Sequence, residues 1–317
     1  MPSAIVAGHV CVDLIPELEA LPDVGPGELA EVGPLTAAAG GCVANTGGAL
    51  AALGADVAVA GDAGDDPLGA LLETMLAARG VDTGQIRRRA GETTSYSLVL
   101  EAPGRDRAFW HHVGANAAFD GATVELAGTD LLHVGYPSLL PALTADGGAA
   151  LSALLARTRE QGAITSLDLA VIDPASDAAR LDWGALLGRL MPLVDVISPS
   201  IEDLRSGLGF VEDLGGAARR LVAMGAGVAL VTAGQDGLAL CTGDAARLRA
   251  AGPALAVAVA RWAGAEHAVP AVEVEVHSTL AAGDAASAGL LWGILDGLGP
   301  RESLQLAAET AAAQVAA

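Results

Sequence analysis

The sequence has 317 residues and contains no lysine, because the basic residues counted in its composition are all arginines. A Walker-type phosphate loop, the ATP-binding lysine of protein kinases and Schiff-base chemistry each need a lysine, so the sequence excludes all three. The pattern G-x-G-x-x-G is also missing, which argues against a nicotinamide-cofactor site. If this chain handles ATP, it must do so with backbone amides and arginine.

Aromatic and charged residues are scarce, at 3% and 17%, whereas hydrophobic residues make up 52% of the chain and exclude a disordered protein. The net charge of −21 opposes phosphate backbones and anionic membranes, so we expect neither nucleic acid nor a membrane as a partner. The three cysteines, Cys11, Cys42 and Cys241, are too far apart for a disulfide framework or a paired zinc motif, and we expect buried free thiols.

Long hydrophobic runs are absent too. Gly, Asp or Arg interrupts each apolar run before it reaches the roughly 20 residues that span a bilayer. Residues 1–6 lack the charged leader of a signal peptide, so the sequence predicts a cytoplasmic protein. The length suits one large α/β domain or two modest ones, and the lack of a repeat or linker favours a single domain over residues 1–317.

Residues 278–284, the stretch S-T-L-A-A-G-D, consist mainly of small side chains that leave the backbone open to a ligand. Apolar residues then recur at helical spacing from Ala288 to Leu298, so the stretch opens a helix. The free N–H groups and positive dipole end of such a helix bind anions, and we interpret Ala281, Ala282 and Gly283 as an anion hole for a phosphate.

A carboxylate at Asp284 would repel a phosphate unless it had a separate task. Taking a proton from an attacking hydroxyl is such a task, which makes Asp284 a candidate catalytic base. The alternative is an ordinary helix start that an aspartate caps.

The first part of the chain carries candidate substrate ligands. Residues 3–11 have the length and apolarity of a strand, and Asp13 follows at its end, where a carboxylate accepts hydrogen bonds from vicinal hydroxyls. Gly40 and Gly41 let a ligand touch the main chain, and Asn45 offers a donor and an acceptor. The alternatives are a turn aspartate at residue 13 and a glycine pair that serves packing.

From residue 131 onward, strands and helices alternate with the regularity of a doubly wound parallel sheet flanked by helices. A hairpin over residues 93–112 interrupts the earlier α/β pattern. Together with the segment before residue 40, it predicts a small β-sheet lid, with lid segments at about 12–38 and 92–113. The adjacent His111 and His112 would point to opposite faces of that hairpin, so we do not expect them to share a metal.

Two later strand ends carry candidate nucleotide chemistry. Glu202 and Asp203 follow a strand and suit a magnesium ion held largely through water. Thr232, Gly234 and Gly237 supply a hydroxyl and an open turn where the phosphates and ribose of a nucleotide fit. Helix-capping acids and a plain glycine turn remain the alternatives.

In combination, these motifs resemble the ribokinase-like (PfkB) carbohydrate kinases over nearly the whole chain. The resemblance rests on Gly40-Gly41 with Asn45, the glycine-rich run 61–69, Thr232-x-Gly234-x-x-Gly237 and Thr279-x-Ala281-Ala282-Gly283-Asp284. It implies an α/β ribokinase-like fold with a lid and transfer of the γ-phosphoryl of ATP to a sugar or nucleoside hydroxyl, with Mg²⁺.

The resemblance also implies residue roles. Asp284 would be the base, with the amides of Ala281, Ala282 and Gly283 as the anion hole. Substrate contacts would come from Asp13, Gly40, Gly41 and Asn45. The nucleotide site would include Thr232, Gly234, Gly237 and Thr279, and Asp203 with Glu202 would organise magnesium.

The sequence departs from the family pattern at Ser278, which replaces an acid, at Ser200 and Asp203, which replace an Asn-x-x-Glu motif, and after Asp168, where a polar partner is missing. A degenerate sensor that binds a sugar or nucleotide therefore remains the second hypothesis. The substrate is a sugar, a phosphosugar or a nucleoside, and Arg105 and Arg107 of the lid are candidates to clamp a substrate phosphate. An exposed lid edge predicts a homodimer.

Overall fold

The computed structural model describes residues 1–104 and 107–317. Among these residues, nine strands form one sheet and four strands form a second, smaller one. The large sheet has the strand order β13-β12-β11-β10-β9-β8-β1-β4-β5, and all its strand pairs from β11 to β5 are parallel. Its strands are β1 Ser3–Gly8, β4 Asp56–Gly64, β5 Asp82–Arg89, β8 Leu131–Gly135, β9 Ile164–Asp168, β10 Val196–Ile197, β11 Val228–Thr232, β12 Leu238–Thr242 and β13 Glu266–Val269.

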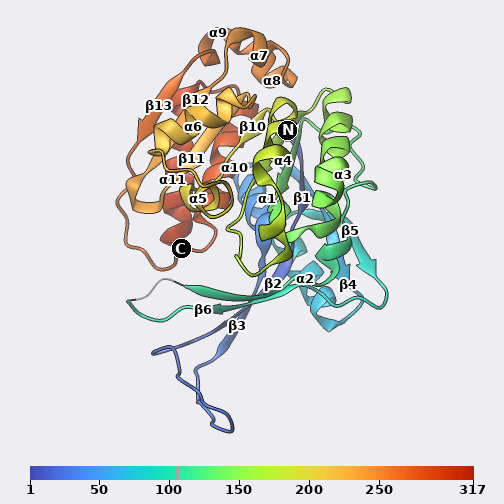
Figure 1. Ribbon diagram of the computed structural model, residues 1–317, viewed down its shortest axis with the longest axis vertical. Helices are drawn as coiled ribbons and strands as arrows, with labels where there is room; N and C mark the ends of the chain where they lie inside the picture. The colour runs from blue at the N-terminus through green and yellow to red at the C-terminus, as the bar shows by residue number, and fades with distance from the viewer. Residues whose placement is uncertain (105–106) are drawn as a thin grey trace.

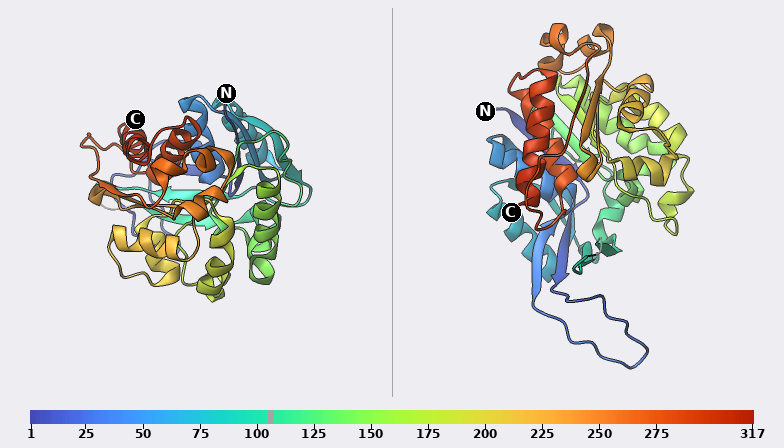
Figure 2. Two further views of the ribbon diagram at one scale, coloured as in Figure 1. Left: turned by 90° about the horizontal axis from the view of Figure 1, so that it is seen from above. Right: turned by 90° about the vertical axis from the view of Figure 1, so that its left-hand side faces the viewer.

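Helices cover both faces of the large sheet, as the view from above in Figure 2 shows. One face packs against α1, α2, α10 and α11, whereas the other packs against α3, α4, α5 and α6, so two hydrophobic cores lie on opposite sides of the strands. The helices are α1 Gly41–Leu53, α2 Pro67–Ala78, α3 Pro141–Glu160, α4 Trp183–Leu190, α5 Ile201–Leu208, α6 Leu214–Ala223, α7 Ala245–Arg249, α8 Pro253–Val257, α9 Val259–Trp262, α10 Ala282–Leu295 and α11 Pro300–Val315.

The smaller sheet is the lid, and it projects from one end of the large sheet (Figure 1). Its strand order is β3-β2-β6-β7, with β2 Cys11–Pro16, β3 Leu35–Gly40, β6 Tyr96–Leu100 and β7 Ala108–His112. Strands β6 and β7 form the expected hairpin, in which Ser97 pairs with His111. The α/β architecture with a lid sheet therefore agrees with the fold that the sequence predicts.

The N-terminal apolar run differs from the prediction, because it is two strands and not one. β1 ends at Gly8, whose φ of 120° turns the chain, and β2 starts at Cys11 in the lid. Asp13 consequently lies in a lid strand and not at the end of a strand of the large sheet. A side chain at position 8 would also lie 2.6 Å from the carbonyl oxygen of Gly135, so only glycine fits this turn.

One further strand, β5, was not predicted, and the state of the cysteines was confirmed. β4 extends to Gly64, into the glycine-rich run 61–69, and β5 pairs with it through a segment that ends in Arg87 to Arg89. The buried Asp62 accepts hydrogen bonds from Arg87 and Arg89, which explains how this charged segment joins a sheet. All three cysteines are free and buried, as expected.

Of the helices in the described part of the chain, none is long and apolar enough to cross a membrane.

Candidate active site

The candidate site lies where the chain order of the large sheet reverses. β1 and β8 are neighbours, but the chain continues from β1 towards β4 on one side and from β8 towards β9 on the other. In open α/β sheets, ligands bind beyond the carboxyl ends of the strands at such a switch point. His9 follows β1, Tyr136 follows β8 and Asp168 ends β9, so three polar side chains converge there.

Asp284 is buried in the first turn of α10, with 2% of its surface exposed. Its Oδ2 accepts hydrogen bonds from Tyr136 Oη at 2.7 Å and from Asn45 Nδ2 at 3.1 Å, and its Oδ1 accepts one from Thr46 Oγ1 at 3.0 Å. Helix α1 and the turn after β8, which are distant from α10 in sequence, thus hold one carboxylate. Burial raises the pKa of Asp284, whereas the hydrogen bonds from Tyr136, Asn45 and Thr46 act to lower it.

The loop before α10 has the predicted open shape. Ala281 adopts the left-handed conformation at φ 62°, which an L-residue adopts at a cost of about 1–2 kcal/mol. This conformation turns the chain into α10, and a side chain at the exposed Gly283 would meet no atom within 4 Å. The N–H of Ala282 donates to the carbonyl of Thr279 at a long 3.4 Å, so its hydrogen bond is weak and easily exchanged.

The lid reaches this loop directly. The Arg107 guanidinium, just before β7, donates a hydrogen bond to the hydroxyl of Thr279. A lid cation therefore lies beside the predicted anion hole. Arg105, the other lid arginine considered as a phosphate clamp, lies outside the described residues.

Among the predicted substrate ligands, Gly40 and Gly41 have neighbours so close that no larger residue fits at either position. A side chain at Gly40 would lie 2.0 Å from the Asp13 carboxyl, and a side chain at Gly41 would lie 2.6 Å from the Nδ1 atom of His9. Gly41 also has φ 80°, which favours glycine. Asp13 is buried at 5% exposure, and burial raises its pKa. The structure thus brings Asp13, Gly40, Gly41 and Asn45 together near Asp284.

Arg79 is a cation beside Asp13 and Asp284 that the sequence did not single out. It lies just past α2 and donates hydrogen bonds to the carbonyls of Ala39 at 2.9 Å and Ala44 at 2.8 Å. A weaker contact of 3.4 Å joins it to the Oδ1 atom of Asn45. Its guanidinium therefore holds the start of α1 and orients the amide that binds Asp284.

Further carboxyls follow along the strand ends. Burial raises the pKa of Asp168 well above its usual value, and the nearby Asp284 and Asp203 raise it further. Burial likewise raises the pKa of Asp203 to about 6, although Ser200 bonds to its carboxyl and acts in the opposite direction. Carboxyls that raise the pKa of one another favour binding of a cation, because a positive charge would stabilise their ionised forms. Within the described residues, however, no group of three or more His, Cys, Asp or Glu side chains is arranged to hold a metal directly.

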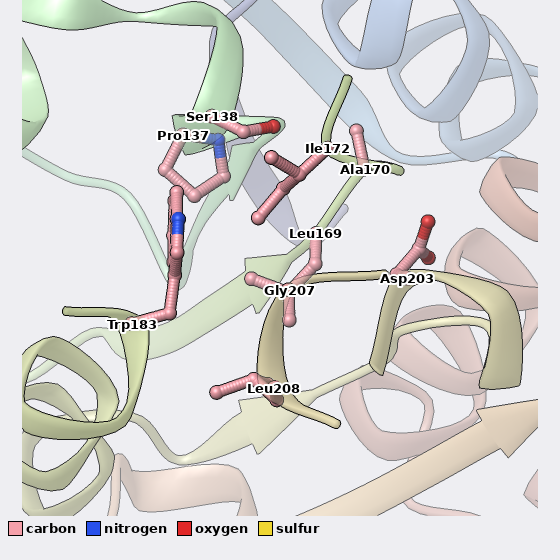
Figure 3. Close-up of a pocket in the computed structure, with 9 residues that line it drawn as sticks. All are labelled: Pro137, Ser138, Leu169, Ala170, Ile172, Trp183, Asp203, Gly207 and Leu208. Atoms are coloured by element: carbon pink, nitrogen blue, oxygen red, sulfur yellow. The ribbon is translucent and has the colours of Figure 1, made fainter. Parts of the chain in front are cut away.

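Asp203 and Glu202 differ in their surroundings. Asp203 closes a capping box with Ser200 at the start of α5, whereas Glu202 is exposed. Asp203 is one of the residues that line a small cavity of about 10 Å³. Figure 3 shows its carboxyl pointing away from Pro137 and Trp183. This cavity has room for about one water molecule. Pro137 and Ser138, which belong to the turn directly after Tyr136, form part of the cavity wall.

The predicted nucleotide residues lie at the end of β11 and in the loop before α10. Thr232 pairs with Ser200 through a parallel bridge, so the ends of β10 and β11 are in register. Gly234 is exposed, with φ 50° and open space around the position of a side chain. A side chain at Gly237 would instead lie 2.3 Å from the carbonyl oxygen of Val269, so packing against β13 already requires glycine there.

Sequence reasoning missed Thr46, Tyr136 and His9. Thr46 follows Asn45 on α1 and looks like an ordinary helix residue, while His9 looks like part of an apolar strand. Tyr136 offered a signal, because an aromatic residue before a proline at a strand end is unusual in a chain with 3% aromatics. Its φ of 62° is one of three positive values at non-glycine residues in the described chain. Such strain often marks a functional position.

Comparisons with known proteins agree with this geometry. The profile described as "pfkB family carbohydrate kinase" matches residues 1–317. Arabidopsis thaliana ribokinase in complex with ribose and ATP is 20% identical, with a TM-score of 0.74 over 99% of this chain and 92% of that one. A putative ribokinase II from E. coli in complex with ATP and Mg²⁺ is 19% identical, with a TM-score of 0.74 over 100% and 94%.

A nucleoside kinase from Burkholderia thailandensis in complex with inosine is 19% identical, with a TM-score of 0.71 over 99% of this chain and 92% of that one. At these identities the likeness establishes the ribokinase-like fold, and the profile match establishes the family.

Proposed function

Because this chain belongs to the pfkB family of carbohydrate kinases, which transfer a phosphoryl group to an alcohol, we propose that it moves the γ-phosphoryl of ATP to a hydroxyl of a small sugar-type substrate. In this reaction Asp284 is the base, and the amides of Ala281, Ala282 and Gly283 form the anion hole. The observation that carries the proposal is the buried Asp284 carboxylate, which Asn45 and Thr46 hold in the first turn of α10, next to the open loop that precedes this helix.

The chemistry follows from these positions. The acceptor hydroxyl gives its proton to Asp284 as its oxygen attacks the γ-phosphorus, and the bond to the β–γ bridging oxygen breaks to release ADP. A positioned base contributes roughly 10²–10⁴ in rate, and each donor aimed at the developing charge contributes roughly 10²–10³. The dipole of α10, a helix of 14 residues, adds positive potential on the phosphate side of the base.

The substrate contacts are proposed for Asp13, Gly40, Gly41 and Asn45, and the nucleotide contacts for Thr232, Gly234, Gly237 and Thr279. The ligands of the relatives, ribose, inosine, ATP and Mg²⁺, support these assignments. Asp203 and Glu202 would organise Mg²⁺ through water, in keeping with a site that lacks a direct ligand cluster among the described residues. When bound, the ion neutralises charge on the phosphates.

A sensor that binds a sugar or nucleotide without turnover is the second candidate function. The observation that favours it is the hydrogen bond from Tyr136 to Oδ2 of Asp284, because that oxygen is already occupied by two donors. A substrate hydroxyl must therefore displace Tyr136 or use the remaining lone pair of Oδ1. Retention of the base beside the anion hole favours the kinase.

Magnesium-dependent ADP release with a panel of sugars and nucleosides tests the proposal. We expect turnover that falls by roughly 10²–10⁴ in Asp284→Asn, because the amide cannot accept the proton. Asp296→Asn, an exposed change at the other end of α10, is the matched control and should leave turnover unchanged. ADP release that survives in Asp284→Asn would refute the role of the base, and tight binding without ADP would establish the sensor.

The homodimer expected through the lid also remains a proposal. The edge strands β3 and β7 expose Leu35 at 60% and Trp110 at 65%, which supports pairing of apolar lid surfaces. A monomer in analytical ultracentrifugation at micromolar concentration would contradict it.

A further inference from the structure

The link between β1 and β2 places an unusual histidine inside the site. His9 has 3% of its surface exposed, yet both of its ring nitrogens lack a hydrogen-bond partner among the described residues. Buried polar atoms are nearly always satisfied, so an unpaired imidazole indicates a ligand or water that completes it. His133 also has an unpaired Nε2, but its Nδ1 lies 2.8 Å from Ser166 Oγ inside the sheet, which accounts for its position.

His9 faces a second imidazole that the lid contributes. The ring of His111 on β7 lies edge-on to that of His9, with centroids 5.0 Å apart. Its Nδ1 is 3.1 Å from Ser97 Oγ, whereas its Nε2 is buried and lacks a partner in the described structure. The large sheet and the lid therefore each place an unsatisfied imidazole nitrogen at the same junction.

This histidine pair is continuous with the proposed base. The ring of Tyr136 lies 5.8 Å from that of His9, and its hydroxyl reaches Asp284. At the other end, Cys11 Sγ approaches Ser97 Oγ at 3.8 Å and donates to Asp13 Oδ1 at 3.3 Å. The histidine pair is thus linked to Asp284 through Tyr136 and to Asp13 through Ser97 and Cys11, so a hydroxyl that bonds to the free ring nitrogens would lie close to both carboxyls.

The charges along this junction decide what kind of molecule fits. Burial lowers the pKa of His9 well below its usual value and lowers that of His111 to about 4, so both rings are neutral near pH 7. A neutral imidazole offers one donor and one acceptor, which matches a hydroxyl group. The nearby Asp13 and Asp284 carboxyls would repel a substrate phosphate. The neighbouring cation, Arg79, already donates to the carbonyls of Ala39 and Ala44.

We propose that His9 and His111 determine substrate specificity by binding the vicinal hydroxyls of an uncharged sugar ring, free or as part of a nucleoside, and that a sugar phosphate is not the substrate. This inference rests on the proposed function, because it assigns the acceptor of the same site. The His9 backbone is fixed by the hydrogen bond from the Val43 N–H to its carbonyl, so one imidazole is held at the end of the large sheet while the lid contributes the other. Arg107, which bonds to Thr279, would then contact the transferred phosphoryl group and not a phosphate on the acceptor.

The test uses the full chain with D-ribose, D-fructose and inosine as neutral probes, and D-ribose 5-phosphate and D-fructose 6-phosphate as charged ones. His111→Leu removes both hydrogen-bonding atoms of the ring, whereas His111→Gln keeps a donor and an acceptor. His112→Leu is the matched control, because His112 is the next residue on β7, is exposed, and bonds to Thr93 instead. Binding is measured by thermal shift and calorimetry without ATP, and KM and kcat by ADP release.

We expect at least one neutral probe to bind more tightly than its phosphorylated counterpart. His111→Leu should weaken that binding and raise KM by about 10-fold, the effect of losing one or two buried hydrogen bonds, while kcat changes by less than about threefold. His111→Gln should recover part of the affinity, and His112→Leu should match the wild type.

Tighter binding of the phosphorylated probes, unchanged affinity in His111→Leu, or no binding of any neutral probe at millimolar concentration would each overturn the proposal. The proposed kinase function fails separately, when a neutral probe binds but yields no ADP. In that case the binding data alone still decide the role of the histidines.

Discussion

Asp203 offers a quantitative test of how the site affects stability. Its pKa of about 6, raised by burial, lies well above the ordinary 3.8, so the folded protein favours the protonated carboxyl. The stability that this protonation contributes is fully present below pH 3.8 and is lost as the pH rises through about 6. At pH 8 the buried charge therefore costs about 3 kcal/mol of the free energy of unfolding, since each pKa unit corresponds to about 1.36 kcal/mol.

In the wild type, the Ser200 N–H donates a hydrogen bond of 2.7 Å to the Asp203 carboxyl. Asp203→Asn removes the charge but keeps an oxygen that can accept this bond. A charge at a helix N-terminus itself contributes about 0.3–1 kcal/mol, so we expect a net gain of about 2–3 kcal/mol at pH 8. The gain should fall to about half at pH 5, where the wild-type carboxyl is mostly protonated. The variant should also lose magnesium-dependent ADP release, because we expect Asp203 to be retained for function although its buried charge lowers stability.

Urea denaturation in EDTA-containing buffers at pH 8 and pH 5 measures both values. Glu202→Gln is the matched control, because Glu202 lies in the same turn but is exposed, and its effect should stay within about 0.5 kcal/mol at either pH. An Asp203→Asn variant that is less stable than the wild type at pH 8, or whose gain does not change with pH, would refute the reasoning.

Two further predictions concern the base and its loop. Ala281→Gly relieves the left-handed backbone and should stabilise the protein by about 1 kcal/mol, raising Tm by about 1–3 °C in calorimetry, and no rise would show that the loop is unstrained. Thr46→Val removes a donor that stabilises the Asp284 carboxylate, so its pKa rises and the acid limb of the pH–rate profile moves to higher pH. We expect kcat/KM to fall about 10-fold on the acid limb of the profile but less than threefold on its plateau, and a uniform loss at all pH values would contradict this role.

The regular part of the fold was predictable because its signals are local. The alternation after residue 131 and the end of α1 at Gly54, whose φ is 106°, depend on short-range pattern and on glycine. The break between β1 and β2 was missed because hydrophobicity is continuous across it. The steric reason for the turn is the carbonyl of Gly135, which lies more than a hundred residues away in sequence.

The same distinction applies to the site. The motifs suffice to predict that Asp284 and Asn45 belong together, and their hydrogen bond agrees with this placement. Thr46, Tyr136, Arg79 and His9 carry no motif, since their importance comes from long-range contacts with residues that the fold brings near. The roles that the family resemblance implies for the nucleotide residues stay predictions, and for Gly237 packing alone explains the glycine.

The connection between the large sheet and the lid has a mechanical consequence. Only His9 and Val10 separate β1 from β2, and the His9 carbonyl is bonded to the N–H of Val43 at the start of α1. A movement of the lid relative to the large sheet would have to change the backbone of this anchored link, which also carries one of the two imidazoles proposed to bind the substrate. A ligand that bonds to the His9 imidazole would therefore contact one of the links between the two sheets directly.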